Sequence, residues 1–212
     1  MYACFNNCDP KTNGELALVK SLPPNLIVFD IGTRADSEFT DYPGIVHYFE
    51  PMPEFIDKLS KLKTLNTTSY YNQFGLSDST AILNYYPRYQ SFHNRTVSCS
   101  VDDSKNVIKL NVKTANEYIS EHKIIHIDFI KIDTEGHELH VLKGFGTYLN
   151  IVDRIQFEYG GTYKDTNTTL LEVITYLRAY GFTKFSYLSP SGNVPITDYS
   201  DHYKYCNILC ER

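Results

Sequence analysis

Short apolar runs, each ending in an acidic residue, recur along this chain. The most continuous run covers 127–132 and ends at Asp133, and three others end at Asp30, Glu50 and Glu158. Such runs are typical of strands that are buried on both faces of a parallel sheet. Because the carboxyl ends of parallel strands meet at one edge, where open α/β sheets bind ligands, the pattern predicts that these four acids gather at a binding edge.

Helical periodicity alternates with these strands. Amphipathic helices are predicted at 15–22, 53–65, 114–122 and 168–180. A further helix is predicted directly after Asp133, with Asp133 or Thr134 as its cap and with Glu135 and Glu138 in its first turn. Together with a final antiparallel pair at 182–188 and 205–209, this order predicts a doubly wound, mostly parallel α/β sheet.

The segment 81–113 departs from this regular order. Alternation near its two ends predicts two antiparallel strands outside the main sheet, and a long polar loop joins them. The loop carries Tyr86, Arg88 and His93, which suit binding of a polar acceptor, but in a chain with 18 tyrosines they are equally compatible with an ordinary surface. We expect one domain over 1–212, with an N-terminal helical extension at 1–25 and this insertion at 81–113.

Composition excludes several classes of protein. The formal charge is −5 and no basic stripe stands out, so nucleic acid is not an expected partner. No apolar run reaches the length of about 18 residues that a membrane helix needs, and the N-terminus lacks a signal-peptide core. We therefore expect an intracellular protein without a membrane span. Five cysteines, an odd number, are expected to be free thiols.

Residues 128–145, DFIKIDTEGHELHVLKGF, resemble a known signature. FkbM-type methyltransferases, which depend on S-adenosylmethionine, have a strand that runs into a Lys-Ile-Asp-x-Glu-Gly-x-Glu turn followed by Val-Leu-x-Gly. The segment Phe49-Glu50-Pro51 is similar to the Phe-Glu-Pro of the same family. The resemblance implies a seven-stranded, Rossmann-like methyltransferase fold.

The resemblance also implies where the cofactor binds. The first strand ends in Asp30, Ile31 and Gly32, and this turn would pass under the methionine part of the cofactor, where glycine lets the backbone come close. Glu50, followed by Pro51, is placed to accept hydrogen bonds from the ribose diol. Near the adenine, the resemblance implies contacts from Ser77 and Asp78.

The turn after Gly32 departs from the usual pattern. Thr33, Arg34 and Ala35 stand where further glycines are expected, which also argues against a dinucleotide fingerprint. The segment up to Gly44 is too short for a full helix plus a loop. We therefore expect a cofactor pocket that is partly open or covered from elsewhere.

Methyl transfer to oxygen requires an aligned acceptor and one group that takes the hydroxyl proton. Asp133 is the first candidate for the proton acceptor and His137 is the second, although His137 is equally compatible with a solvated helix residue. Glu135 and Glu158 are candidates to orient the acceptor or, with Asp133, to bind a divalent cation such as magnesium, calcium or manganese. Whether a metal is required stays open.

For the acceptor we expect a sugar hydroxyl of a glycan or glycolipid, with Tyr86, Arg88, His93 and Tyr159 as candidate contacts. Two alternatives stay open. One is a metal-dependent O-methyltransferase of a phenolic or polyketide small molecule. The other is a non-catalytic binding module on a degenerated methyltransferase fold, which the missing glycines favour and the retained acids oppose.

Overall fold

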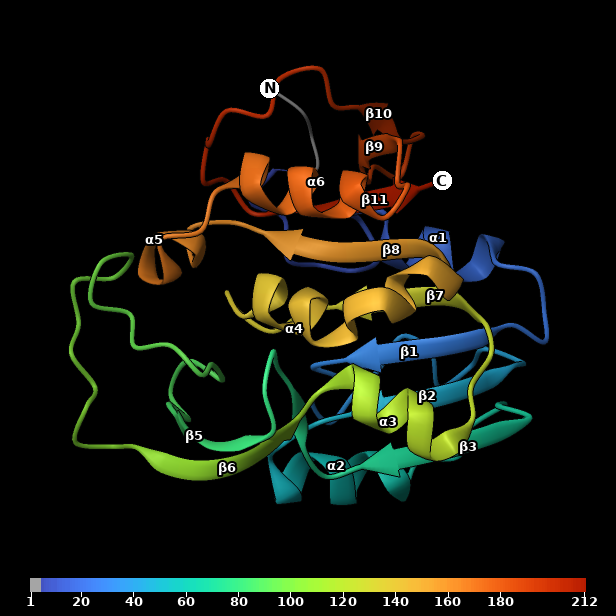
Figure 1. Cartoon of the computed structure of the whole chain (residues 1–212), viewed down its shortest axis with the longest axis horizontal. Helices are drawn as coiled ribbons and strands as arrows, with labels where there is room; N and C mark the ends of the chain where they lie inside the picture. Colours follow the sequence, from blue (N-terminus) through green and yellow to red (C-terminus); the bar gives the residue numbers. More distant parts are fainter. Residues whose placement is uncertain (1–4) are drawn as a thin grey trace.

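An eight-stranded sheet forms the centre of the computed structural model, which describes residues 5–212 (Figure 1). In spatial order its strands are β10 (Val194–Pro195), β9 (Lys184–Tyr187), β11 (Cys206–Glu211), β8 (Val152–Tyr159), β7 (Ile127–Ile132), β1 (Ile27–Ile31), β2 (Ile45–Phe49) and β3 (Thr68–Asn72). The five strands from β8 to β3 are parallel, and β11 is antiparallel to both β8 and β9. The predicted doubly wound, mostly parallel sheet is confirmed, with the two-residue β10 as an additional edge strand.

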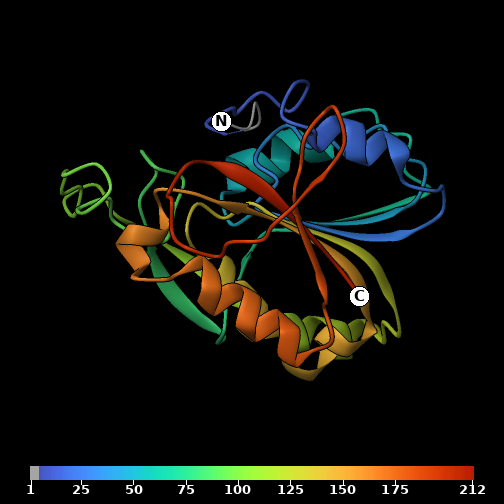
Figure 2. The same cartoon turned by 90° about the horizontal axis from the view of Figure 1, so that it is seen from above.

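Helices cover both faces of the sheet (Figure 2). One face carries α1 (Glu15–Ser21) and α2 (Pro53–Ser60), and the other carries α3 (Ala115–His122), α4 (Glu138–Phe145), the 3-10 helix η1 (Gly146–Ile151) and α6 (Leu170–Ala179). The short helix α5 (Tyr163–Thr166) lies at the carboxyl edge, beyond the end of β8. Two apolar clusters, one on each face, hold these layers to the sheet.

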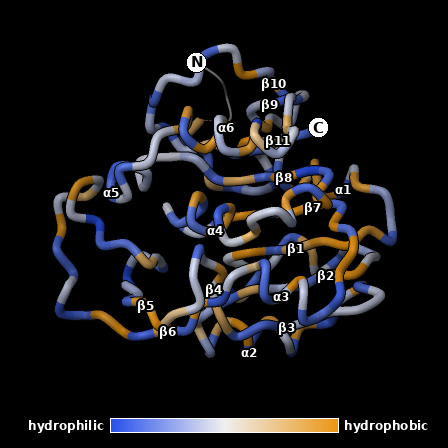
Figure 3. Tube along the Cα trace, in the orientation of Figure 1, coloured by the Kyte–Doolittle hydropathy of each residue, from blue (hydrophilic) through white to orange (hydrophobic). Residues whose placement is uncertain are grey.

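The central strand β7 is buried on both faces, as its sequence predicts. Ile130 and Ile132 pack into the cluster under α3, α4 and α6, whereas Phe129 packs into the cluster under α1 and α2, and all three are fully buried. Figure 3 shows the same strand, with its neighbour β1, as a hydrophobic trace through the middle of the molecule. This apolar centre fixes the position of the polar turns that follow each strand.

Between β1 and β2 the chain forms turns and bends at 33–43 and no helix. Helix α1, which precedes β1 in the sequence, covers this face instead, and Phe39 and Tyr42 from the turns pack beside its Val19. The expectation of a shortened connection after Gly32 is therefore confirmed. On this side of the sheet, the helix that would ordinarily follow β1 is replaced by α1, which precedes β1.

The predicted insertion forms a second, small sheet. β5 (Ala81–Tyr85) pairs antiparallel with β6 (Ile108–Lys113), and β4 (Gly75–Leu76) adds to β6 in parallel. The loop between β5 and β6 returns toward the carboxyl edge of the main sheet (Figure 1). It is held there because the hydroxyl of Ser91 donates a hydrogen bond of 2.8 Å to the carbonyl of Glu135, in the turn after β7.

The predicted start of α4 is wrong by several residues. The helix begins at Glu138 with His137 as its N-cap, because Glu135 (φ 55°) and Gly136 (φ 101°) adopt left-handed conformations that a helix cannot contain. Neither Asp133 nor Thr134 caps it. Instead Oε1 of Glu138 reaches back and accepts hydrogen bonds from the backbone N–H of Thr134 (2.9 Å) and of Gly136 (3.2 Å).

Two further expectations concern α2 and the cysteines. Helix α2 ends at Ser60 and not at Leu65, and Leu62 is 45% exposed instead of facing the core.

Cys8, Cys99 and Cys210 carry free thiols, and Cys4 lies outside the described residues. Within the described part of the chain, no helix has both the length and the apolar character needed to cross a membrane.

Candidate active site

A pocket lies at the carboxyl ends of β1, β2 and β7. Including the solvent at its mouth, it holds about 500 Å³. The strand ends contribute Ile31, Gly32, Glu50, Pro51, Asp133 and Glu135, and the facing wall comes from the small sheet and its loop, with Leu76, Tyr85, Gln90 and Phe92. The structure therefore brings together five of the cofactor-binding residues expected from the sequence, namely Ile31, Gly32, Glu50, Pro51 and Asp133.

Gly32 and Asp133 bring two backbone turns into direct contact at the floor of this pocket. Gly32 has φ +84°, and a Cβ at this position would lie 1.9 Å from the carbonyl oxygen of Asp133. The N–H of Asp133 in turn donates to the carbonyl of Ile31 at 2.9 Å. Only glycine permits this approach, and the two turns together form a cradle of backbone at the floor of the pocket.

Glu50 lies at the end of β2 with its carboxylate held by the backbone. Oε1 accepts a hydrogen bond of 2.8 Å from the N–H of Met52, and Oε2 accepts one of 2.9 Å from the N–H of Arg34. Burial raises the pKa of Glu50 to about 7, and these two hydrogen bonds oppose that rise. A carboxylate offers about four lone-pair directions, so each oxygen keeps one for a further donor such as a hydroxyl group.

Asp30 is not part of the pocket lining. It is fully buried, its Oδ2 accepts a hydrogen bond of 2.5 Å from Ser37, and its Oδ1 has no hydrogen-bond partner among residues 5–212. Burial raises the pKa of Asp30 to about 6. The residue thus lies behind the Gly32 turn and supports the 33–43 segment, and in this structure it does not face the pocket.

Three acids meet where β7 and β8 end. Oxygen atoms of Asp133, Glu135 and Glu158 lie within 4.8 Å of one another, an arrangement that is able to hold a divalent cation. Burial raises the pKa of Asp133 to about 8, although nearby Lys131 opposes this and Glu135 adds to it. Burial and the charge of Asp133 likewise hold the pKa of Glu158 well above its ordinary value.

Lys131 provides the positive charge beneath these acids. Its ammonium group lies 2.8 Å from Glu38, 3.5 Å from Glu15 and 3.8 Å from Asp133, and its side chain is 8% exposed. Burial alone would lower the pKa of Lys131, but Glu15 and Glu38 outweigh it and hold the pKa well above the ordinary value. The lysine therefore stays charged and links α1, the 33–43 segment and the end of β7.

Arg95 fastens the insertion to the same turn. Its guanidinium group forms a 2.6 Å ion pair with Glu135 and lies 3.9 Å from Asp165 of α5, with the Arg95 side chain 5% exposed. Asp165 also accepts hydrogen bonds from the backbone N–H groups of Val97 and Ser98. Glu135 is thus committed to a buried ion pair, which leaves Asp133 and Glu158 as the acids without such a partner in the insertion.

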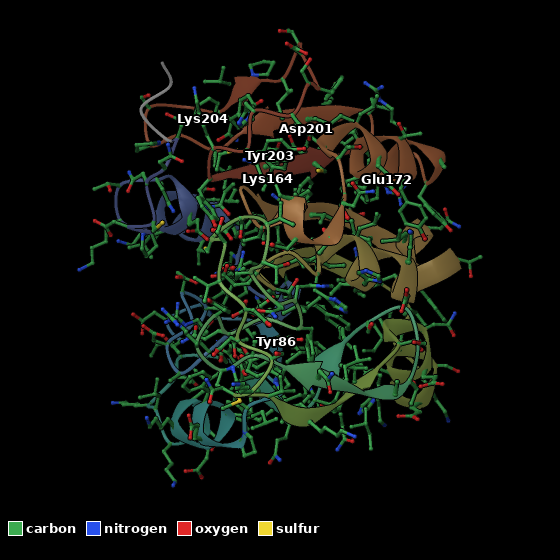
Figure 4. The ribbon with its side chains drawn as sticks, turned by 90° about the vertical axis from the view of Figure 1, so that its left-hand side faces the viewer. Tyr86, Lys164, Glu172, Asp201, Tyr203 and Lys204 are labelled. Carbon is green, nitrogen blue, oxygen red and sulfur yellow. The ribbon has the colours of Figure 1, made fainter. Side chains whose placement is uncertain are left out.

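A second pocket adjoins the first, and Phe92 lines both. The second pocket contains five residues expected from the sequence to belong to the site, namely Ser77, Asp78, Tyr86, His93 and His137. Figure 4, which faces the carboxyl edge, labels Tyr86, the residue that directly follows β5 of the small sheet. The expected adenine contacts and two of the expected acceptor contacts therefore lie together beside the cofactor pocket, on the far side of Phe92.

His137 occupies the N-cap of α4 and not its first full turn. Its Nε2 lies 2.9 Å from the hydroxyl of Ser77 and its Nδ1 lies 2.8 Å from Nε2 of His93, so both ring nitrogens are engaged. Burial lowers the pKa of His137 well below its ordinary value and that of His93 to about 4. Both imidazoles are therefore neutral near pH 7.

Two expected acceptor contacts are not brought to either pocket. Tyr159 is fully buried, its hydroxyl donates to Asp201 at 3.0 Å, and the N–H of Tyr203 donates to it at 3.1 Å. Arg88 is exposed, and its guanidinium group lies over the ring of Tyr89. Among the described residues, neither Tyr159 nor Arg88 lines the two pockets.

Sequence reasoning passed over Phe92, and it named Tyr85 and Arg95 only among the residues of 81–113 that suit a polar acceptor, not as residues that shape this site. The alternation of β5 contained the signal for Tyr85, because residues 81, 83 and 85 share the less exposed side of that strand. Tyr85 is buried in the pocket wall and packs edge-to-face against Phe92 at 5.2 Å. No local pattern marks Phe92 or Arg95, whose contacts depend on how the long loop folds back.

Comparison with known proteins identifies the family and the fold. The methyltransferase FkbM domain model matches residues 30–184. The chain is similar in structure to a TehB-like SAM-dependent methyltransferase from Corynebacterium glutamicum, with a TM-score of 0.50, 10% sequence identity and coverage of 94% of this chain and 87% of that one. It is also similar to a precorrin-6y C5,15-methyltransferase from Geobacter metallireducens, with a TM-score of 0.47, 12% identity and full coverage of both chains. No curated protein matches the chain.

Replacing Lys131 by methionine should destabilise the protein by about 3–5 kcal/mol at pH 7, the usual cost of removing one partner from a buried ion pair. The reason is that the carboxylates of Glu15 and Glu38 lose the cation that compensates them. Urea unfolding followed by circular dichroism measures the change, with Lys143→Met on the exposed side of α4 as the matched control. A loss below about 1 kcal/mol would show that the acids do not depend on this lysine.

The protein without cofactor should become less stable as pH rises from 6.5 to 8. In this window the folded state retains protons on Glu50 and Glu138, with pKa values of about 7, and on Asp133, with a pKa of about 8. The unfolded state has already lost these protons, so the folded state binds more protons than the unfolded state. Each retained proton therefore lowers the free energy of unfolding by up to about 1.4 kcal/mol for each pH unit of rise.

Melting temperatures at pH 6.5, 7.2 and 8.0 and constant ionic strength test this prediction. His47 and His93, with pKa values lowered to about 4, act in the opposite direction but only below about pH 6.5, where the unfolded imidazole gains its proton. Asp133→Asn should flatten the slope. A melting temperature that rises with pH in the wild type would contradict the retained protons.

Proposed function

Because the chain belongs to the FkbM methyltransferase family and is a methyltransferase dependent on S-adenosylmethionine, we propose that it methylates a hydroxyl oxygen on a sugar of a glycan or glycolipid. The observation that carries this proposal is the position of Asp133. This acid lines the pocket beside the glycine cradle and has a pKa raised to about 8. Once ionised, a carboxylate with a raised pKa is a stronger base than an ordinary one, and a sugar hydroxyl needs a base at the moment of transfer.

The residues present fit the cofactor. The bare backbone at Gly32 suits the close approach of the methionine part, and the free lone pairs of Glu50 suit the ribose diol. Bound S-adenosylmethionine supplies an electrophilic methyl group on a positively charged sulfur. Burial raises the pKa of Asp133 and of Glu158, and a positively charged sulfur beside them would lower both values, so that the two acids would then provide negative charge on that side of the pocket.

In the proposed reaction the acceptor oxygen bonds to the methyl carbon while the bond from that carbon to sulfur breaks, and the electron pair stays on sulfur. Asp133 takes the hydroxyl proton, and Glu158, within 4.8 Å of it, orients the hydroxyl group. Glu135 holds the insertion through Arg95 and so positions the wall of the pocket. His137 is less suited to receive the proton, since both of its ring nitrogens are already engaged.

The sugar acceptor is supported by the polar and aromatic character of the insertion. Tyr85 and Gln90 line the cofactor pocket, and Tyr86 and Asn84 line the neighbouring pocket. Aromatic rings beside amide and hydroxyl groups are able to cover the face of a sugar while bonding its hydroxyls. Arg88 lies exposed near this region and His93 lies inside the second pocket, and both remain candidate acceptor contacts.

The three-acid cluster favours one alternative function, a metal-dependent O-methyltransferase of a phenolic or polyketide acceptor. A magnesium or manganese ion bound by Asp133, Glu135 and Glu158 would lower the pKa of the acceptor hydroxyl. Lys131 at 3.8 Å from Asp133 and the Arg95–Glu135 pair already neutralise part of this cluster, which disfavours the ion. For this reason we place the metal-free sugar enzyme first.

Two substitutions separate cofactor binding from catalysis. Glu50→Ala should weaken S-adenosylhomocysteine binding by about tenfold or more, since hydrogen bonds to a charged group are worth about 1.5–3 kcal/mol. Asp133→Asn should keep affinity within about threefold and lower kcat by about 10²–10⁴-fold, the range expected for a lost proton acceptor. Calorimetry and single-turnover assays measure the two effects.

Glu54→Gln is the matched control, because this exposed acid begins α2 four residues after Glu50. This substitution should change neither the affinity for S-adenosylhomocysteine nor kcat. If a folded wild-type protein binds no S-adenosylhomocysteine, the binding-module alternative is correct. If Asp133→Asn keeps full turnover, another group takes the proton.

An acceptor panel with radiolabelled S-adenosylmethionine tests the substrate class. Oligosaccharides and glycolipids should accept label, simple phenols should not, and treatment with a chelator should leave transfer to sugars within about twofold, since the proposed reaction uses a carboxylate and no ion. Label on phenols only, with activity restored by magnesium or manganese but not by zinc, would support the metal-dependent alternative.

A further inference from the structure

Three histidines from two separate segments meet in the second pocket. His93 comes from the loop between β5 and β6, His137 caps α4, and His140 lies in the first turn of that helix. Each offers a ring nitrogen, and these atoms lie within 4.8 Å of one another. In the methyl-transfer reaction proposed above, His93 is a candidate acceptor contact, but none of the three histidines takes part in the chemistry.

The outer hydrogen bonds of two of these rings decide which nitrogens face inward. The hydroxyl of Ser77 lies 2.9 Å from Nε2 of His137, and Asp78 lies 2.9 Å from Nδ1 of His140. These contacts leave Nδ1 of His137 and Nε2 of His140 on the inner side, where Nδ1 of His137 is bonded to Nε2 of His93 and an inner ligand would replace that hydrogen bond. In metal sites a carboxylate or other polar group holds the outer nitrogen of a ligating histidine in this way, which fixes the ring and its tautomer.

The inward side is compact. Nε2 of His93 lies 2.8 Å from Nδ1 of His137, and the rings of His137 and His140 stack with centroids 4.5 Å apart. Two ligands on a tetrahedral zinc ion, with bonds of about 2.0–2.1 Å, lie roughly 3.4 Å apart. The His93–His137 pair therefore has to open by about half an ångström to admit an ion, a change that a side-chain rotation in the loop supplies.

We propose that His93, His137 and His140 bind a divalent transition-metal ion, most suitably Zn²⁺, with a fourth position open to the pocket. Imidazole nitrogens are ligands for zinc and related ions, whereas magnesium and calcium require oxygen. Three protein ligands with one open position suit zinc. Tyr86 and Asn84 line the side of the pocket from which the fourth ligand would enter.

Such an ion would tie the acceptor-side loop to the start of α4. His93 follows Phe92, which lines both pockets, and it precedes by two residues Arg95, which is already paired with Glu135. The Arg95–Glu135 ion pair thus already holds the loop near the start of α4, so His93 needs little reorganisation to reach an ion. Binding of the metal would fix Phe92 in the wall of the cofactor pocket.

A second candidate metal-binding cluster, His126 with Asp128 and Asp153, serves as a comparison for the three-histidine site. His126 lies 3.2 Å from both Asp128 and Asp153, but His126 is 45% and Asp153 is 54% exposed. This cluster has one nitrogen ligand and lies on the surface, away from either pocket lining. A zinc ion that prefers several imidazoles should choose the three-histidine site.

The test uses the full chain without an affinity tag, stripped of metal by a chelator and then dialysed. Titration with Co²⁺, followed by visible absorption, should give the spectrum of a tetrahedral cobalt site that saturates at one ion per chain. Titration with Zn²⁺, followed by elemental analysis after gel filtration, should likewise give one ion per chain. His93→Ala and His140→Ala should each weaken binding by more than tenfold, and Asp78→Asn should weaken it by about 10–100-fold. His126→Ala should leave both affinity and spectrum unchanged.

His140 is part-exposed, so its replacement should not impair folding, and circular dichroism confirms this before each titration. A wild-type protein that retains no zinc at micromolar concentration would overturn the proposal. So would loss of binding in His126→Ala with full binding in His93→Ala and His140→Ala. Because the readout is metal content and not methyl transfer, a failure here leaves the proposed reaction untouched, and the reverse also holds.

Discussion

The buried ammonium group of Lys131 is the interaction on which the arrangement at the carboxyl edge depends. Acids at strand ends repel one another, and burial adds to the cost of their charge. Lys131 lies beneath them on the central strand and contacts Glu15, Glu38 and Asp133. Through these contacts one side chain joins α1, the helix-free connection after β1 and the turn after β7, and it allows the acids to share a small volume.

The turn after β7 serves two neighbours at once. Its backbone at Asp133 packs against Gly32 at the floor of the pocket, and its side chain at Glu135 pairs with Arg95 of the insertion. The left-handed conformations of Glu135 and Gly136 make this double contact possible, because they delay the start of α4 and turn the chain toward both neighbours. A continuous helix from Asp133 would present these groups differently.

Phe92 divides the carboxyl edge into an acidic pocket and a histidine-rich pocket. Gly75 makes room for it, since a Cβ there would lie 2.9 Å from the Phe92 ring. On one side lie Glu50 and Asp133, which suit the cofactor and the proton, and on the other lie His93 and His137. The insertion that supplies Phe92 therefore shapes the cofactor pocket even though its own strands form a separate small sheet.

The sequence alone determined the sheet, the family and the strand-end residues of the pocket at the carboxyl edge. These features depend on local order: an apolar run followed by an acid or a glycine places Gly32, Glu50 and Asp133 wherever the strands pair. Tertiary structure decided what lies opposite them. Tyr159 ends a strand like the others, yet the C-terminal loop buries it, and His93 joins His137 from 44 residues away. The physical reason is that strand register follows from short-range pattern, whereas the closure of a long loop depends on side-chain contacts between distant segments, which no local periodicity records.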